Sequence, residues 1–169
     1  MLFGSTAASA LPNISVICET GFNAGHSAIT FLVANPTATY IGFDLGDMGW
    51  SATAVEFVKF LFGDRFIYIK GFTKNTLIEA NMGGRKCDLL SVDADHHNAY
   101  GDIILGRAVS RKDAYVLADD YSSSCPLVPR DWKRAEKENI IRTLDCHQDA
   151  HWMVRGEYFK GWCLGQFIG

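Results

Sequence analysis

Acidic side chains stand where short apolar runs of the sequence end. Four of the five apolar runs end in such an acid, namely Glu19, Asp44, Asp93 and the pair Asp119–Asp120. Carboxylates are expensive to bury, and folding requires none at these places. Each acid alone could cap the helix that follows it. Their recurrence at the run ends instead indicates that they share one binding site.

The first acid opens a glycine turn in which Gly21 and Gly25 are spaced Gly-x-x-x-Gly. Gly21 allows a tight turn, and Gly25 opens a helix whose backbone N–H groups face the site. Dinucleotide-binding turns have the spacing G-x-G-x-x-G instead. The carboxylate of Glu19 would repel a pyrophosphate but suits a cation. The turn therefore favours S-adenosylmethionine, which carries a sulfonium and an ammonium group, over NAD.

Two further inferences depend on this turn. Asp44 lies 23 residues after Gly21, close to the spacing at which an acid binds the ribose hydroxyls of a nucleotide; its alternative role is a turn-former before the next helix. We also expect Gly25→Val to abolish cofactor binding while preserving the fold, because a β-branched side chain would obstruct the approach of the ligand to the backbone.

The elements that position these acids follow from alternating apolar and helical segments. The apolar runs cover residues 14–18, 40–43, 66–69, 88–92 and 114–118, and the helical stretches between them cover 25–34, 51–62, 75–82 and 99–109. Such alternation predicts a parallel sheet with helices on both faces. A charged helix is expected at 129–142, followed by strands at 151–158 and 161–167. Their two-residue connection requires an antiparallel pair near the C-terminal end.

Length and composition are those of one globular domain, taken as residues 1–169 with a short segment, 1–13, before the first strand. The net charge of −3 argues against nucleic acid as a partner, and no apolar run is long enough to span a membrane. An odd number of cysteines without framework spacing predicts free thiols in a reducing, cytoplasmic setting. These cysteines are Cys18, Cys87, Cys125, Cys146 and Cys163.

Four segments together resemble the class I S-adenosylmethionine-dependent methyltransferases. They are Glu19–Ser27, which has the form E-x-G-x-x-x-G-x-S, with Phe43–Gly46, Asp88–His96 and Val116–Asp120. The resemblance is strongest to the small-molecule O-methyltransferase-like group, which is similar to the catechol and caffeoyl types. It implies an α/β, Rossmann-like, doubly wound and mostly parallel sheet of seven strands with an antiparallel C-terminal strand.

The resemblance also implies a set of cofactor contacts. Asp44 would bind the ribose hydroxyls, and Asp93 would lie beside the transferable methyl group. Phe72 and Thr73 stand where many relatives have an acid near the adenine, so Phe72 could stack on the base and Thr73 could hydrogen-bond to it. The residues of the first turn, implied at the methionine end, are Glu19, Gly21, Phe22, Asn23, Gly25 and Ser27.

A divalent metal ion and a general base are implied on the acceptor side. Asp93, Asp119 and Asp120 match the metal ligands of the cation-dependent relatives, and three oxygen donors suit Mg²⁺. The alternative is that Asp120 caps a turn and no metal binds. His96 is the expected general base, acting in catalysis with Asp93, whereas His97 is as readily a surface or capping residue.

The favoured function is methyl transfer to an oxygen of a small-molecule acceptor. The alternatives are a non-catalytic binding or assembly module with the same fold and a nucleotide-cofactor oxidoreductase. Relatives usually carry helices before the first strand that cover the acceptor. The pocket is therefore expected to be less enclosed, and the alternatives are a missing segment, a homodimer partner or other covering segment, and lost activity.

Overall fold

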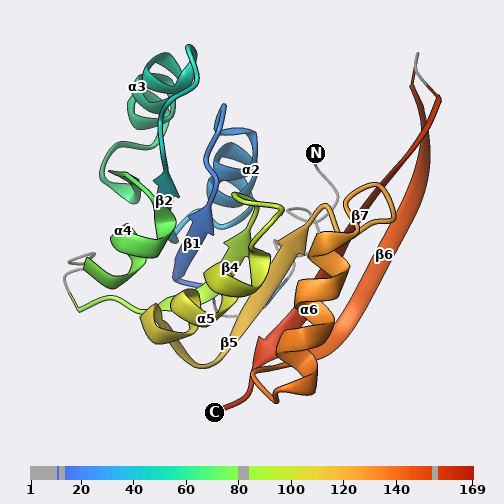
Figure 1. The fold of residues 1–169 in the computed structure, drawn as a ribbon. Helices are drawn as coiled ribbons and strands as arrows, with labels where there is room; N and C mark the ends of the chain where they lie inside the picture. Colours follow the sequence, from blue (N-terminus) through green and yellow to red (C-terminus); the bar gives the residue numbers. More distant parts are fainter. Residues whose placement is uncertain (1–10, 12–13, 80–83, 154–155) are drawn as a thin grey trace.

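The structure, a computed structural model, describes residue 11 and residues 14–79, 84–153 and 156–169, with only the backbone described for 150–153 and 156–158. A seven-stranded sheet has the order β3-β2-β1-β4-β5-β7-β6 (Figure 1). Its strands are β1 Val16–Thr20, β2 Thr39–Asp44, β3 Phe66–Lys70, β4 Cys87–Val92, β5 Ser110–Asp119, β6 Ile141–Met153 and β7 Gly156–Phe167. Strands β1 to β5 are parallel, and β7 is antiparallel to both of its neighbours. The predicted doubly wound sheet is confirmed.

Helices cover both faces of the sheet, and alternate residues of each strand face opposite layers. In β1, Cys18 packs toward α4, α5 and α6, whereas Ile17 packs toward α2 and α3. None of these helices, within the described ranges, is both long and apolar enough to cross a membrane. The helices are α2 His26–Ala34, α3 Ser51–Phe62, α4 Thr73–Glu79, α5 Ala99–Val109 and α6 Leu127–Lys137, with the short 3₁₀ turn η1 Gly63–Arg65 after α3.

The C-terminal hairpin differs from the prediction. The strands were predicted at 151–158 and 161–167, but β6 begins at Ile141 and β7 begins at Gly156. The expected turn at 159–160 lies inside β7, and the helix expected to reach 142 ends at Lys137. Asn139 has a left-handed backbone, with φ of 55°, which terminates a helix. The predicted antiparallel pairing is correct, but its boundaries are wrong; the predicted end of the helix at 75–82 lies outside the described residues.

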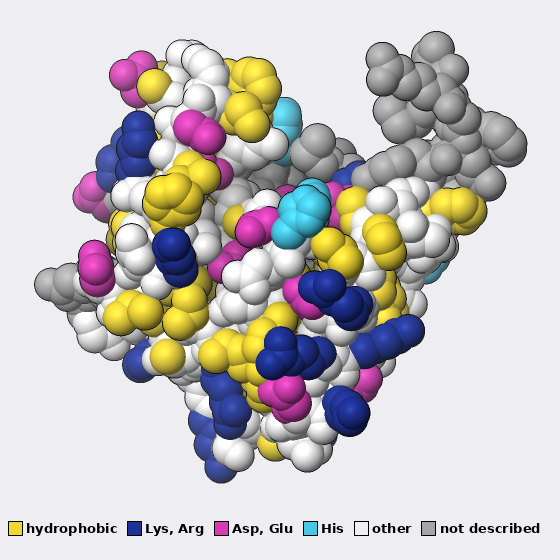
Figure 2. All heavy atoms as spheres, in the orientation of Figure 1, with side chains coloured by type: hydrophobic (Ala, Val, Ile, Leu, Met, Phe, Trp, Pro, Cys, Tyr) yellow, Lys and Arg dark blue, Asp and Glu magenta, His cyan; other side chains and the backbone are white. Residues whose placement is uncertain are grey.

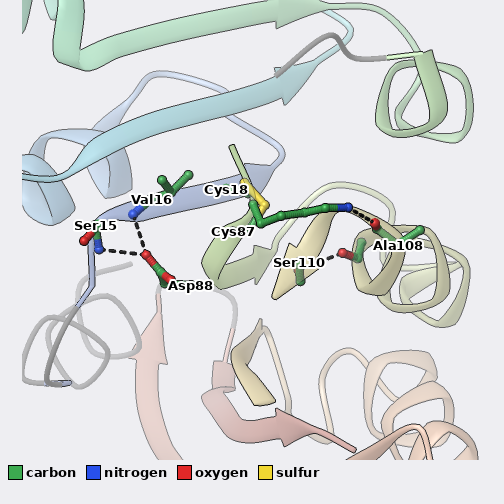
Figure 3. Close-up of a disulfide and its surroundings, with 9 residues drawn as sticks. Ser15, Val16, Cys18, Cys87, Asp88, Ala108 and Ser110 are labelled. Carbon is green, nitrogen blue, oxygen red and sulfur yellow. Dashed lines mark hydrogen bonds between the residues drawn. A yellow bond between two sulfur atoms is a disulfide. The ribbon is translucent and has the colours of Figure 1, made fainter. Parts of the chain in front are cut away.

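The cysteines also differ from the prediction. Cys18 and Cys87 form a disulfide between β1 and β4, with their Cα atoms 5.7 Å apart (Figure 3). Cys146 and Cys163 form another between β6 and β7, and Cys125 belongs to neither. Free thiols are therefore wrong for four cysteines, and the argument for a reducing compartment loses its basis. Spacing along the chain does not reveal which strands become neighbours in the sheet.

Candidate active site

The glycine turn after β1 packs directly against the end of β4. Gly21 has φ of +88°, and its N–H donates to the carbonyl oxygen of Phe43 at 2.8 Å. A Cβ atom at this position would lie 2.1 Å from the carbonyl oxygen of Asp93. Only glycine allows both the left-handed backbone and this approach, so the structure supports the conformational role predicted for Gly21.

Gly25, at the start of α2, is required by the fold itself. Its φ is +78°, and a Cβ atom there would lie 2.7 Å from the ring of Phe22. That ring is buried in the core, where its centroid lies 5.4 Å from Phe66 and 5.3 Å from Tyr68. The expectation that Gly25→Val preserves the fold is therefore not supported. Phe22 was predicted to contact the cofactor, but its ring is packed in the hydrophobic core.

Glu19 is a fully buried carboxylate surrounded by hydroxyl groups. It accepts hydrogen bonds from Ser27 at 2.6 Å, from Ser91 at 3.2 Å and from the hydroxyl of Tyr40. Burial, followed by the negative charge of Asp93, raises the pKa of Glu19 to about 8. The hydroxyl of Ser27, predicted to contact the cofactor, is thus directed at Glu19.

Asp44, at the end of β2, holds the turn in place. Its Oδ2 accepts from the backbone N–H of Asn23 at 3.0 Å, and its Oδ1 accepts from that of Gly46 at 2.6 Å. Asn23 has a left-handed backbone with φ of 50°. Its Oδ1 accepts from the indole of Trp50 at 2.9 Å. The carboxylate is half-buried and faces the cavity described next.

Two cavities lie at the carboxyl ends of the strands. The larger is about 620 Å³ in volume and includes six predicted cofactor residues, Gly21, Asn23, Asp44, Phe72, Thr73 and Asp93. The smaller is about 30 Å³ and adds Glu19, Ser27 and Asp119. Both cavities share Gly21, Asn23 and Asp93. This arrangement places the predicted residues around a volume typical of small-molecule sites.

Asp102 is a lining residue that the sequence analysis missed. It lies in the first turn of α5, is only 3% exposed and accepts a hydrogen bond from the hydroxyl of Thr73 at 2.7 Å. Burial raises its pKa above the ordinary value for an aspartate. The hydroxyl proton of Thr73 is therefore directed at Asp102 rather than at a ligand. In the sequence, an acid at this point resembles an ordinary complement to the helix dipole.

His96 joins the acids at the ends of β4 and β5. Its Nε2 lies 3.7 Å from Oδ1 of Asp93 and 3.2 Å from Oδ2 of Asp120. The proximity of Asp93, together with the charges of both acids, raises the pKa of His96. Figure 2 shows acidic side chains and a histidine gathered in the middle of one face. The backbone N–H of the exposed His97 donates a hydrogen bond to Oδ1 of Asp95 at 2.9 Å.

Lys160 is the second residue that the sequence analysis missed. It extends from β7, and its ammonium group forms an ion pair with Oδ1 of Asp120. Its positive charge opposes a rise in the pKa values of Asp93 and Asp119, but burial and the neighbouring carboxylates still raise both, that of Asp119 to about 6. Lys160 falls in the two-residue turn predicted at 159–160, so no site role was predicted for it, whereas it lies inside β7.

The three aspartates predicted to bind a metal are not arranged as one ligand set. Across the described residues, the group of three ligand-type atoms within 4.8 Å of one another is formed by His96, Asp120 and Cys125. Asp93 and Asp119 do not complete such a group with Asp120, although two oxygens on opposite sides of one Mg²⁺ would be only about 4.2 Å apart. The structure thus brings Asp120 to His96, Cys125 and Lys160 rather than to Asp93 and Asp119.

Neither of two sequence comparisons finds a relative. No family model matches the chain, and no curated protein matches it. The arrangement of the strands and helices must therefore provide the comparison.

Solved structures share the fold across nearly the whole chain. An O-methyltransferase from Bacillus cereus in complex with SAH has a TM-score of 0.75 at 14% identity, covering 98% of this chain and 79% of that one. The O-methyltransferase TomG from Streptomyces achromogenes, in complex with SAM, has a TM-score of 0.74 at 16% identity, covering 98% of this chain and 78% of that one. A candidate RNA methyltransferase from Pyrococcus horikoshii has a TM-score of 0.73 at 12% identity, covering 98% of this chain and 80% of that one. These likenesses confirm the methyltransferase fold and do not identify an acceptor.

Proposed function

We propose that this protein is an S-adenosylmethionine-dependent methyltransferase that methylates an oxygen of a small molecule. The observation that carries the proposal is the buried Glu19 behind the glycine turn, at the edge of the 30 Å³ cavity. A carboxylate held among hydroxyl groups gains most from a ligand that brings a positive charge. The solved structures with SAM or SAH bound on this fold support the same choice.

The residues present fit this cofactor. Glu19 and Asp93 would face its ammonium group, and the unused lone pairs of Asp44 would accept from the ribose hydroxyls. Phe72 is 59% exposed at the cavity rim and would cover the adenine, with Asp102 as an acceptor for its amino group. When bound, the cofactor supplies a methyl group on a sulfonium centre.

The chain's own residues would contribute to the chemistry by accepting a proton and by orienting the acceptor. His96 would take the proton of the acceptor hydroxyl on its imidazole ring, and Asp93 and Asp120, which face Nε2, would stabilise the resulting imidazolium. The walls of the cavities would fix the acceptor in line with the methyl group, which accounts for much of the rate in reactions of this kind. The carboxylates around His96 disfavour a phosphate-rich acceptor, which agrees with a neutral or cationic small molecule.

The divalent ion implied by the resemblance fits the described side chains poorly. Asp93, Asp119 and Asp120 would be its ligands, but both oxygens of Asp120 are already engaged by Lys160 and His96. The three carboxylates also fail to lie within one coordination sphere. We therefore assign no step to a metal ion.

Titration calorimetry with S-adenosylhomocysteine and NADH tests the cofactor assignment. We expect S-adenosylhomocysteine to bind and NADH not to bind. Asp44→Asn should weaken S-adenosylhomocysteine by about 1–3 kcal/mol, the usual cost of a lost charge-assisted hydrogen bond. Lys133→Met, an exposed change on α6, serves as the control. Binding of NADH without binding of S-adenosylhomocysteine would refute the proposal.

A further inference from the structure

Lys160 is held over Asp120 by the extension of β7 beyond the sheet. Strands β5 and β7 pair as far as Asp119 and Trp162, and the β6–β7 ribbon then continues past the end of β5 (Figure 1). Lys160 lies on this continuation. The hairpin therefore carries a cation back to the carboxyl end of β5, where the acids of the site lie.

Backbone contacts on both sides fix the position of Lys160. The N–H of Phe159 donates to Oγ of Ser124 at 2.9 Å, and the carbonyl of Gly161 accepts from the N–H of Tyr121 at 3.0 Å. A Cβ atom at Gly161 would lie 2.3 Å from the carbonyl oxygen of Tyr121, so glycine is needed for this approach. The lysine is consequently placed by the fold and does not depend on a flexible side chain alone.

Asp120 is shaped to receive this ammonium group. Its backbone is left-handed, with φ of 52°, a conformation that costs free energy and is typical of functional sites. The carboxylate is 7% exposed, with Lys160 on Oδ1 and His96 on Oδ2. A buried carboxylate with both oxygens engaged has little capacity left to ligate an ion.

The acids of this site require a positive charge, since Asp93, Asp119 and Asp120 repel one another when ionised. In the cation-dependent methyltransferases that the sequence resembles, a divalent ion supplies it. We propose that in this protein Lys160 supplies that charge instead, as a positioning residue that assembles the acceptor side of the pocket without a metal ion. The inference rests on the proposed function of the same pocket.

Binding of Mn²⁺ tests the proposal without any turnover. Calorimetric titration of Mn²⁺ should detect no binding at this site in the unmodified protein. Lys160→Met frees Oδ1 of Asp120, and we expect Mn²⁺ binding to become detectable, at an affinity at least tenfold above the detection limit set by the unmodified protein, equivalent to about 1.4 kcal/mol. Lys160→Arg retains the charge and should bind no better than the unmodified protein.

Two controls identify the site. Lys133→Met removes the same charge from an exposed position on α6 and should leave Mn²⁺ binding unchanged. Adding Asp120→Asn to Lys160→Met should abolish the gained binding. If Lys160→Met does not fold, Lys160→Gln replaces it, because an amide retains a hydrogen bond to Asp120 without the charge.

The outcomes are distinct from those of the cofactor test. Tight Mn²⁺ binding by the unmodified protein would overturn the proposal, and so would equal binding before and after Lys160→Met. S-adenosylhomocysteine is titrated into the same samples separately. Its failure to bind would reject the methyltransferase function, whereas the Mn²⁺ result concerns only Lys160.

Discussion

At the scale of single residues, the site is a set of carboxylates whose proton affinities differ with their surroundings. Glu19 is fully buried and near Asp93, and its pKa is raised to about 8. The pKa of Asp119 is raised to about 6, again by burial and by the charge of Asp93. At neutral pH, Glu19 therefore carries a proton until a cation arrives. Binding of the ammonium group of the cofactor should release that proton.

The raised pKa of Glu19 predicts a pH dependence of stability. The folded protein holds the proton up to about pH 8, whereas the unfolded chain releases it near the ordinary value of 4.5. The contribution of Glu19 to the free energy of unfolding is therefore fully present below pH 4.5. It is lost as pH rises toward 8, by at most about 1.4 kcal/mol per pH unit. Glu19→Gln stays neutral and should lack this slope.

Urea unfolding of the parent and Glu19→Gln proteins at pH 5, 6, 7 and 8 measures the difference. The amide can keep accepting hydrogen bonds from Ser27 and Tyr40, so the comparison isolates the proton. The other acids titrate in both proteins and cancel. Parallel stability profiles across this range would show that Glu19 does not hold its proton as described.

At the scale of elements, the site depends on the junction of β1, the glycine turn and α2. Three of its residues have left-handed backbones, namely Gly21, Asn23 and Gly25. These conformations direct the turn across the ends of β2 and β4, where Asp44 and Asp93 lie. The turn is thereby packed against the core through Phe22 as well as facing the cavity.

Gly25→Ala tests whether this junction is required for folding. A methyl group would meet the ring of Phe22 and would also need a left-handed backbone. We expect unfolding free energy to fall by about 1–3 kcal/mol. Gly49→Ala is the matched control, because nothing lies within 4 Å of its added Cβ. Chemical denaturation compares the two, and equal stabilities would contradict the packing of Phe22 against Gly25.

At the scale of the whole molecule, long-range cross-links join strands that are far apart in sequence. The disulfide of Cys18 and Cys87 spans 69 residues and joins β1, which carries Glu19, to the adjacent strand β4, which Asp93 follows. Beside it, Asp88 accepts from the backbone N–H groups of Ser15 and Val16, each at 2.9 Å (Figure 3). The centre of the sheet is therefore held by covalent and polar contacts together.

Alkylation followed by mass spectrometry tests these cross-links. In protein unfolded without a reductant, we expect alkylation at Cys125 and protection of the other four cysteines. Reduction of Cys18–Cys87 should lower the unfolding free energy by about 3–5 kcal/mol, since the closed loop is long. Alkylation of all five cysteines before reduction would contradict the disulfides.

Much of the site could be predicted from the sequence because its residues belong to local patterns. Glu19, Asp44, Asp93 and Asp119 each follow an apolar run, and parallel strands bring such ends to one edge of the sheet. The glycine turn has its own spacing, which predicts its backbone conformation. These features depend on neighbours along the chain, so sequence alone determined the class of fold and the edge of the sheet at which the acids gather.

Only the tertiary structure decided the remaining contacts, because their partners are distant along the chain. Lys160 meets Asp120 across 40 residues, and Thr73 meets Asp102 across 29. Cys18 meets Cys87 because the strand order places β1 beside β4. No local pattern encodes these pairs, since they arise from the order of strands and the length of the final hairpin. The charge that balances the acids is therefore a property of the folded sheet.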